Sequence, residues 1–230
     1  MTDEWKNMIL GIHNELRNEF AQGKYAGYEK ANRMGTVEWD DELTYFADLN
    51  TKRCQYGHDA CHPTEEWQYT GQNIAFAAST GELEPVKSMT QKLTHVWFDE
   101  YKVTDMSYLA RYQPGPDRPW VLNFTFLLES LELTLLRFAC SHQNGHFAQM
   151  VQERATRVGC SVIKYKQEGK NWYYYVCNYN WGILSGLPIY QVGEPTTGCK
   201  SGANPQYPAL CSMAEEYTIE ELYTIARKYQ

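Results

Sequence analysis

Hydrophobic positions recur at three- and four-residue steps in several parts of the chain, the spacing that lines one face of an α-helix. This pattern predicts long helices over residues 5–22, 40–56 and 84–102, the second of which begins at an aspartate suited to cap it. Shorter helices are predicted after Gly145 and over residues 218–229. The chain is therefore expected to carry several amphipathic helices.

The spacing becomes alternating in two neighbouring runs, "VGCSVIKYKQ" at 158–167 and "NWYYYVCNY" at 171–179. The residues between them, Glu168-Gly169-Lys170, suit a tight turn, so the two runs predict an antiparallel β-hairpin. The segment "GQNIAFAA" at 71–78 predicts a third strand.

One stretch, residues 121–143, is rich in leucine and fits neither pattern. The apolar run that leads into it, residues 120–128, is too short to cross a bilayer, and Glu129 and Glu132 interrupt its continuation. Integral membrane association is therefore not expected.

Composition places the chain among globular proteins, because 43% of its 230 residues are hydrophobic and 21% are charged. The formal net charge is −7, and the sequence contains no block of lysine and arginine residues. Nucleic-acid binding is not expected, since neutralising phosphates requires clustered basic side chains.

The seven cysteines suggest an oxidising compartment. They include no C-x-x-C pair of the kind found in structural zinc sites. Six fall into local couples, and Cys140 is left over; the predicted disulfides are Cys54–Cys61, Cys160–Cys177 and Cys199–Cys211. No signal peptide is visible at the first residues, which an incomplete gene model or a trimmed sequence would explain.

Four polar residues are candidates for a functional site: His58, Gln72, Glu100 and His146. Two histidines and a carboxylate can bind a divalent metal, or the carboxylate and a histidine can exchange protons. Each residue taken alone also fits an ordinary hydrogen-bonded structural role. No motif for a nucleophile, a phosphate loop or a dinucleotide site is present.

Several motifs together resemble the CAP superfamily, the cysteine-rich secretory, antigen 5 and pathogenesis-related proteins. They occur in the family's order over residues 5–190: "HNELRNEFAQG", "MGTVEWDDEL", "GQNIA", "VWFDEY", "GHFAQMV" and "YYVCNY". The segments "CQYGHDAC" and "GCKSGANPQYPALCS" resemble the insect antigen 5 branch in particular. The resemblance implies an α+β fold, a three-layer α-β-α sandwich, with a disulfide-closed extension at 191–230, and a secreted, extracellular protein.

The resemblance also implies a central groove with two histidines and two acidic residues. By motif position, His58 and His146 match the histidines and Glu100 matches one acid. The second acid is replaced by Gln72, which keeps the hydrogen-bonding shape and loses the charge and the titratable proton. No cofactor is required, and Zn²⁺ is the metal that the family implies at His58 and His146.

Residues 121–143 stand where related proteins have a short polar loop, so they form an insertion in the domain at 5–190. Three interpretations remain open: a lineage-specific loop or helix packed on the domain, a lipid-facing lid, and a retained intron whose excision would leave six cysteines. We place no functional residue in this segment.

Three functions remain open. The first is a secreted, non-enzymatic protein that binds a small amphiphile, a lipid or a protein receptor through the groove and surface loops. The second is a zinc-dependent hydrolase or protease that uses His58, His146 and Glu100. The third is an interaction protein, such as a venom or salivary effector, that acts through its surface loops.

Overall fold

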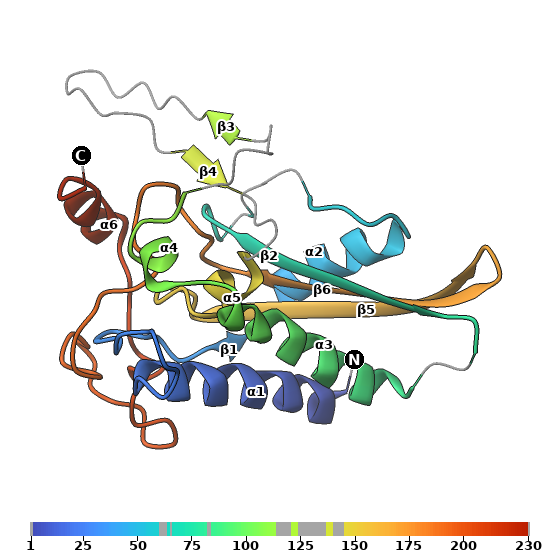
Figure 1. Ribbon diagram of the computed structural model, residues 1–230, viewed down its shortest axis with the longest axis horizontal. Helices are drawn as coiled ribbons and strands as arrows, with labels where there is room; N and C mark the ends of the chain where they lie inside the picture. Colours follow the sequence, from blue (N-terminus) through green and yellow to red (C-terminus); the bar gives the residue numbers. More distant parts are fainter. Residues whose placement is uncertain are drawn as a thin grey trace.

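A computed structural model of the chain describes residues 2–59, 64, 66–81, 84–113, 121–123, 137–139 and 145–229, the two short central segments by their backbone alone. Helices and strands are interspersed along the sequence (Figure 1). In chain order the elements are α1 (Asp3–Ala21), β1 (Glu38–Trp39), α2 (Asp41–Lys52), β2 (Gly71–Ser79), α3 (Val86–Asp99), the 3₁₀ turn η1 (Glu100–Lys102), α4 (Met106–Ala110), β3 (Val121–Asn123), β4 (Arg137–Ala139), α5 (Gly145–Met150), β5 (Arg157–Gln167), β6 (Lys170–Tyr179) and α6 (Ile219–Ala226).

A four-stranded sheet in the order β1-β5-β6-β2 forms the middle layer. Strands β5 and β6 are the predicted hairpin, and their turn is at Glu168 and Gly169, which have φ of 50° and 72°. Two consecutive residues with positive φ give a turn whose twist matches that of the strands. The predicted strand at 71–78 is β2, which pairs antiparallel with β6 and forms one edge of the sheet.

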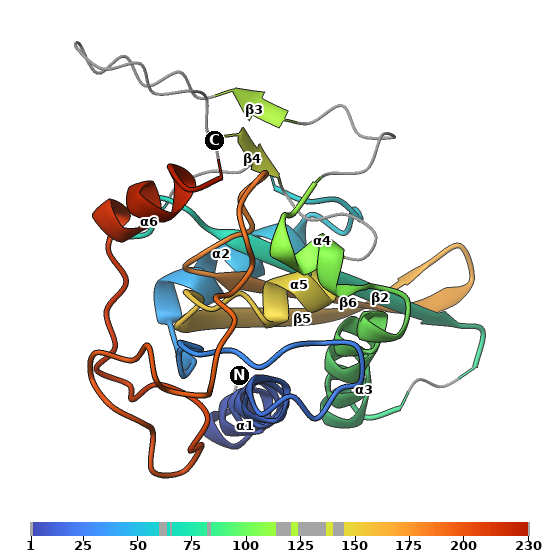
Figure 2. The same ribbon diagram turned by 60° about the vertical axis from the view of Figure 1, so that its left-hand side comes forward.

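Alternating residues of β6 build a core on each face of the sheet. Tyr175, Cys177 and Tyr179 belong to the larger core cluster, which includes residues of α1, α3 and α5. Tyr174 and Val176 belong to a smaller cluster with Ala47 of α2 and Ile74 of β2. Figures 1 and 2 show α1 and α3 on one side of the sheet and α2 on the other, so the predicted α-β-α sandwich is confirmed.

Helix α2 lies directly on the backbone of β5. A Cβ atom at Gly159 would stand 2.2 Å from the Thr44 nitrogen and 2.5 Å from the Asp40 oxygen. Asp40 caps the helix as predicted, because its side chain accepts a hydrogen bond from the Leu43 N–H. The position of α2 over the sheet therefore requires a residue without a side chain in the facing strand.

Two of the three predicted disulfides are confirmed. Cys160 and Cys177 are directly opposed on β5 and β6, with 4.1 Å between their Cα atoms, and Cys199 bonds to Cys211. The pairing of Cys54 with Cys61 is corrected, because Cys54 is a free, exposed thiol. Helix α2 ends at Lys52, before the predicted residue 56, and Cys54 follows with φ of 51°. This change of direction leaves the Cys54 side chain in solvent; Cys61 and Cys140 lie outside the described residues.

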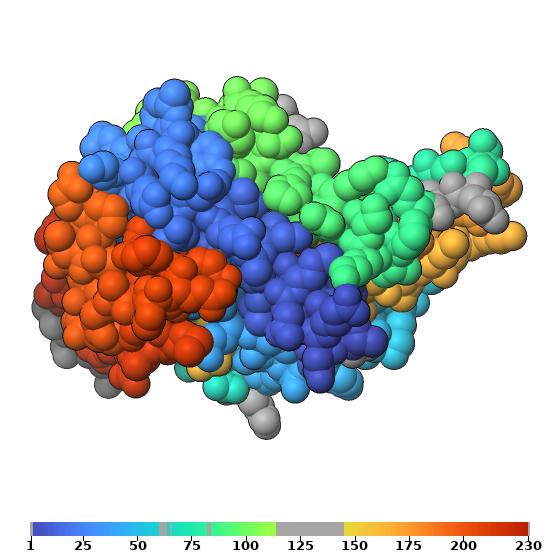
Figure 3. Space-filling view, turned by 90° about the horizontal axis from the view of Figure 1, so that it is seen from below, coloured from blue at the N-terminus to red at the C-terminus, as the bar shows by residue number. Residues whose placement is uncertain are grey.

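The C-terminal extension closes on the segment between α1 and β1. Gly35 forms a bridge with Cys211, and Ala31 forms one with Val192. In the space-filling view of Figure 3 the extension, orange to red, packs against the blue N-terminal helix. The predicted last helix is α6, with a capping box at Thr218 and Glu221.

Only the two ends of the 121–143 insertion are described, and there β3 and β4 pair antiparallel. The remainder lies outside the described residues, so the three interpretations of this segment remain predictions. None of the described helices has the length and apolar character needed to cross a bilayer.

Candidate groove site at strand β2

His146 and Glu100 form a close pair. His146 is the second residue of α5, and Glu100 follows the end of α3. The His146 Nδ1 lies 2.7 Å from one carboxylate oxygen of Glu100, and the Phe147 N–H donates to the other at 3.1 Å. Because a carboxylate only accepts, Nδ1 is the donor, and in the neutral ring Nε2 then has the lone pair. That Nε2 atom is buried and has no hydrogen-bond partner in the part of the chain that the structure describes.

Aromatic and amide groups hold the His146 ring in place. Trp97 stacks on it with 6.0 Å between ring centroids and stacks on Tyr175 with 4.7 Å. The Asn73 amide donates to the His146 carbonyl at 3.2 Å and to the Tyr179 hydroxyl at 3.3 Å. The imidazole is therefore fixed before any ligand arrives, as a binding site requires.

A buried histidine extends this network inward. His13 of α1 lies 3.0 Å from the Tyr179 hydroxyl and 2.8 Å from the Ile9 carbonyl. Burial lowers the pKa of His13 to about 4, so the ring is neutral near pH 7. His13 is thus a structural member of the core.

His58 and Gln72 form the second pair. The Gln72 carbonyl accepts from His58 Nδ1 at 3.0 Å and from the Asp59 N–H at 3.1 Å. Its amide donates to Asp59 at 2.7 Å and to Asn178 at 2.9 Å. Both lone pairs and both N–H groups of Gln72 are therefore used. An uncharged side chain suits this position, because it both accepts from two donors and donates to two acceptors.

The two pairs meet at the edge strand β2. Gln72 and Asn73 are consecutive residues on it, so their side chains leave opposite faces, Gln72 toward His58 and Asn73 toward His146. Desolvation first, and then the charge of Glu100, raises the pKa of the Tyr56 hydroxyl. All four predicted groove residues are thus brought to one strand, as two pairs.

The donors fit a divalent metal in part. Each histidine engages an oxygen acceptor through Nδ1, the arrangement that directs Nε2 toward an ion, and at His146 the acceptor is a carboxylate. Among the described residues, no group of three or more His, Cys, Asp or Glu side chains is arranged to hold a metal ion. Each histidine therefore offers its Nε2 atom as a possible metal ligand.

Comparison with known proteins identifies the family. Residues 10–179 match the family model described as the cysteine-rich secretory protein family, CAP. The chain belongs to the CAP family. It is 37% identical to Venom allergen-1 of Aedes aegypti over 220 residues, 96% of this chain and 77% of that protein. It is 33% identical to the antigen 5 like allergen Cul n 1 of Culicoides nubeculosus over 189 residues, 82% of this chain and 71% of that protein.

Solved CAP structures agree with the fold. The crystal structure of NaASP2 with Zn²⁺ covers 92% of this chain and 97% of its own, with a TM-score of 0.64 and 26% identity. The structure of BmVAL-1 covers 94% of this chain and 97% of its own, with a TM-score of 0.66 and 20% identity, and supports the fold alone. This CAP protein is secreted and extracellular, as are its venom allergen and antigen 5 relatives.

Sequence reasoning missed several groups that shape the site. Asp59 and Asn178 complete the hydrogen bonds of Gln72, and Trp97 stacks on His146. Asp59 follows His58 directly, and Asn178 lies in the quoted motif "YYVCNY", so both were within recognised segments. Their roles depend on strand register, which pairs Asn178 with Gln72 and was not predicted.

Proposed function

We propose that this CAP protein is a non-enzymatic extracellular binding protein whose groove at β2 takes a small amphiphile or lipid. Its relatives carry venom allergen and antigen 5 names, which favour an effector that acts by binding. A protein receptor at the same surface is the second partner class, and the experiments below separate the two.

An exposed aromatic strip beside the His58–Gln72 pair carries this proposal. Tyr56 and Phe76 are 59% and 49% exposed, and their ring centroids are 5.0 Å apart. Phe76 lies on the same face of β2 as Gln72, and its ring is 5.7 Å from that of Trp172. Large apolar rings exposed next to fixed polar groups offer an amphiphile both an apolar surface and hydrogen-bonding partners.

Removing the two exposed rings tests the amphiphile. The double substitution Tyr56→Ala and Phe76→Ala is expected to weaken binding of a fluorescent fatty acid or sterol by about tenfold or more, because apolar contact area is lost. Fluorescence titration measures this affinity. Tyr45→Ala is the matched control, since Tyr45 is 58% exposed but lies on α2. The amphiphile proposal would be contradicted if Tyr45→Ala weakened ligand binding as much as the double substitution, or if the double substitution left binding unchanged. A protein receptor would then be the remaining partner class.

Zinc is the metal we propose for the two histidines. His146→Ala is expected to remove zinc binding. Glu100→Gln is expected to weaken it about 10- to 100-fold, because a neutral amide replaces the carboxylate that accepts from His146 Nδ1. Isothermal titration with ZnCl₂ near pH 7.5 measures both effects. His95→Ala is the control, because His95 is an exposed histidine on α3. The zinc proposal fails if the control loses as much affinity as His146→Ala.

A zinc-dependent hydrolase is the alternative function. The His146–Glu100 pair is the one arrangement that favours it, because it joins a possible ligand to an acid. Gln72 argues against it, since its amide carries no titratable proton and all its hydrogen-bonding capacity is used. Hydrolysis of a peptide or ester that rises with bound zinc and disappears in His146→Ala would establish the enzyme instead.

A further inference from the structure

A cavity of about 600 Å³ lies between the ends of the sheet strands and the C-terminal extension, away from the groove residues. Its walls come from residues 66–69, from Arg154, Thr156 and Arg157, from Asn180 and Trp181 after β6, and from residues 213–219. None of the four groove residues lines it. A volume of this size matches that of pockets for small organic ligands.

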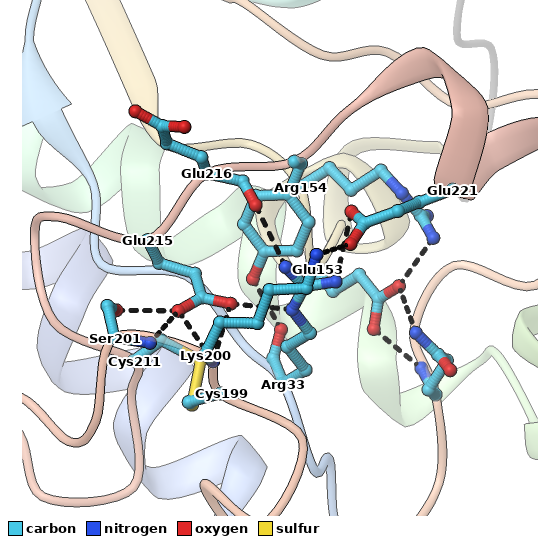
Figure 4. Close-up of polar contacts among 12 residues, drawn as sticks. Arg33, Glu153, Arg154, Cys199, Lys200, Ser201, Cys211, Glu215, Glu216 and Glu221 are labelled. Atoms are coloured by element: carbon cyan, nitrogen blue, oxygen red, sulfur yellow. Dashed lines mark hydrogen bonds and ion pairs between the residues drawn. A yellow bond between two sulfur atoms is a disulfide. The ribbon is translucent and has the colours of Figure 1, made fainter.

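Two buried N–H groups in the wall of this cavity have no hydrogen-bond partner among the described residues. They are Nε of Arg154 and Nε1 of Trp181, whose side chains pack together with the guanidinium carbon 5.9 Å from the ring centroid. Arg154 uses Nη2 for an ion pair with Glu153 at 2.8 Å, and its side chain is 3% exposed (Figure 4). Glu153 also accepts two hydrogen bonds from Gln191, so its carboxylate is already shared.

Neighbouring polar groups of the cavity wall are satisfied, which makes these two donors distinctive. The side-chain oxygen of Asn180 accepts hydrogen bonds from the backbone N–H groups of Thr156 and Arg157. Glu215 accepts from Arg33 and from the N–H groups at residues 200 and 201, as Figure 4 shows. The polar groups of the inner wall that still lack a partner are therefore hydrogen-bond donors. One of them belongs to a cationic side chain, so an anionic acceptor suits the pair.

Aromatic rings and acidic side chains define the rest of the ligand. Trp67 and Tyr217 line the cavity, and Tyr69 packs on Trp181 with 5.2 Å between ring centroids. Glu66 and Glu216 are exposed lining residues, so negative charge stands at the rim. Rings favour an apolar body, and the rim repels a second negative charge.

We propose that this cavity binds a small amphipathic monocarboxylate, with its carboxylate at Arg154 and Trp181 and its apolar body among the rings. The two N–H groups are covered in the free protein, so binding includes a side-chain shift that lets the carboxylate supply the missing acceptor. The site is separate from the groove at β2 and does not depend on the function proposed there.

A matched pair of probes tests the charge requirement. 1-Naphthaleneacetate and the neutral 1-naphthaleneethanol share the ring, and isothermal titration of the full chain gives both dissociation constants. The acid is expected to bind at least about tenfold more tightly, the effect of one charge-assisted hydrogen bond. Equal affinities of the two probes would overturn the inference.

Two substitutions locate the binding site. Trp181→Phe keeps the ring and removes the N–H, and it is expected to weaken the acid about threefold or more while leaving the alcohol unchanged. Arg154→Gln is expected to abolish the preference for the acid; if this variant does not fold, Trp181→Phe decides. Trp5→Phe is the control, because it removes an indole N–H that donates to Thr90 outside the cavity. Acid binding unchanged in Trp181→Phe, or equally weakened in Trp5→Phe, would refute the cavity as the site.

Discussion

Replacing Arg33 with methionine is expected to lower the free energy of unfolding by about 3–5 kcal/mol. Arg33 donates to Glu215 at 2.6 Å and to the Glu216 carbonyl at 2.8 Å, and it pairs with Glu221 at 3.1 Å (Figure 4). The Glu215 side chain is 0% exposed and that of Arg33 is 8% exposed. Removing the guanidinium leaves a buried carboxylate without its cation, which is costly to hold away from water.

Urea unfolding followed by tryptophan fluorescence measures this loss, with an unchanged dependence on urea as evidence of a common unfolded state. Lys30→Met is the control, because the Lys30–Glu194 pair is exposed and is expected to contribute less than about 1 kcal/mol. If the two variants lost similar amounts of unfolding free energy, burial would not explain how much the Arg33 contacts contribute to stability.

The contacts between Arg33 and Glu215 also make the stability of the fold depend on pH. Burial alone would raise the pKa of the Glu215 carboxyl, but hydrogen bonds from Ser201, Arg33 and the Lys200 N–H outweigh it and hold the pKa below its ordinary value. A carboxyl with a lowered pKa stabilises the fold above its unfolded pKa, and this stability is lost as pH falls through its folded pKa. Stability should therefore decline below about pH 4.5, and the decline should be smaller in Arg33→Met.

Substituting alanine for Gly159 is expected to destabilise the fold by about 3 kcal/mol or more. The new Cβ would collide with the backbone of α2, at 2.2 Å from the Thr44 nitrogen and 2.6 Å from the Leu43 carbonyl carbon. Backbone atoms inside a helix cannot rotate away as a side chain can. Helix α2 would have to move off the sheet and open the core around Ala47 and Tyr174.

The control is Gly11→Ala in α1, where a Cβ atom would meet nothing within 4 Å. Alanine there is expected to add about 0.5–1 kcal/mol of stability, because glycine weakens a helix interior. Thermal and urea unfolding of both variants measure the difference. A Gly159→Ala protein as stable as the parent would mean that α2 is not fixed against β5.

Local patterns predicted the elements whose partners are near in sequence. The hairpin at Glu168–Gly169 and the aspartate cap of α2 depend on adjacent residues, and both are confirmed. The two-residue strand β1 was missed, because it exists only through its pairing with β5 more than a hundred residues later. The Arg33–Glu215 contact joins residues 182 positions apart and left no signal in either segment.

The candidate site was predictable through its motifs and not through its contacts. Family order identified His58, Gln72, Glu100 and His146, and the structure brings them to β2 in two pairs. The sequence could not say that Asn178 and Asp59 saturate Gln72, since this depends on register and loop direction. The direction of the backbone at Cys54 also explains why its predicted pairing was wrong. The sequence spacing of two cysteines limits how far apart they can lie, but it does not determine where their side chains point.

The buried Arg17 has a consequence for the order in which the protein is made. Its guanidinium donates to the Gly35, Met150 and Gln152 carbonyls, and the last two belong to backbone that is synthesised more than a hundred residues later. During translation the helix emerges well before the Met150 and Gln152 acceptors, and the two disulfides among the described residues join cysteines only 17 and 12 residues apart. Helix α1 can therefore complete its hydrogen bonds to the core only after residue 152 has been synthesised.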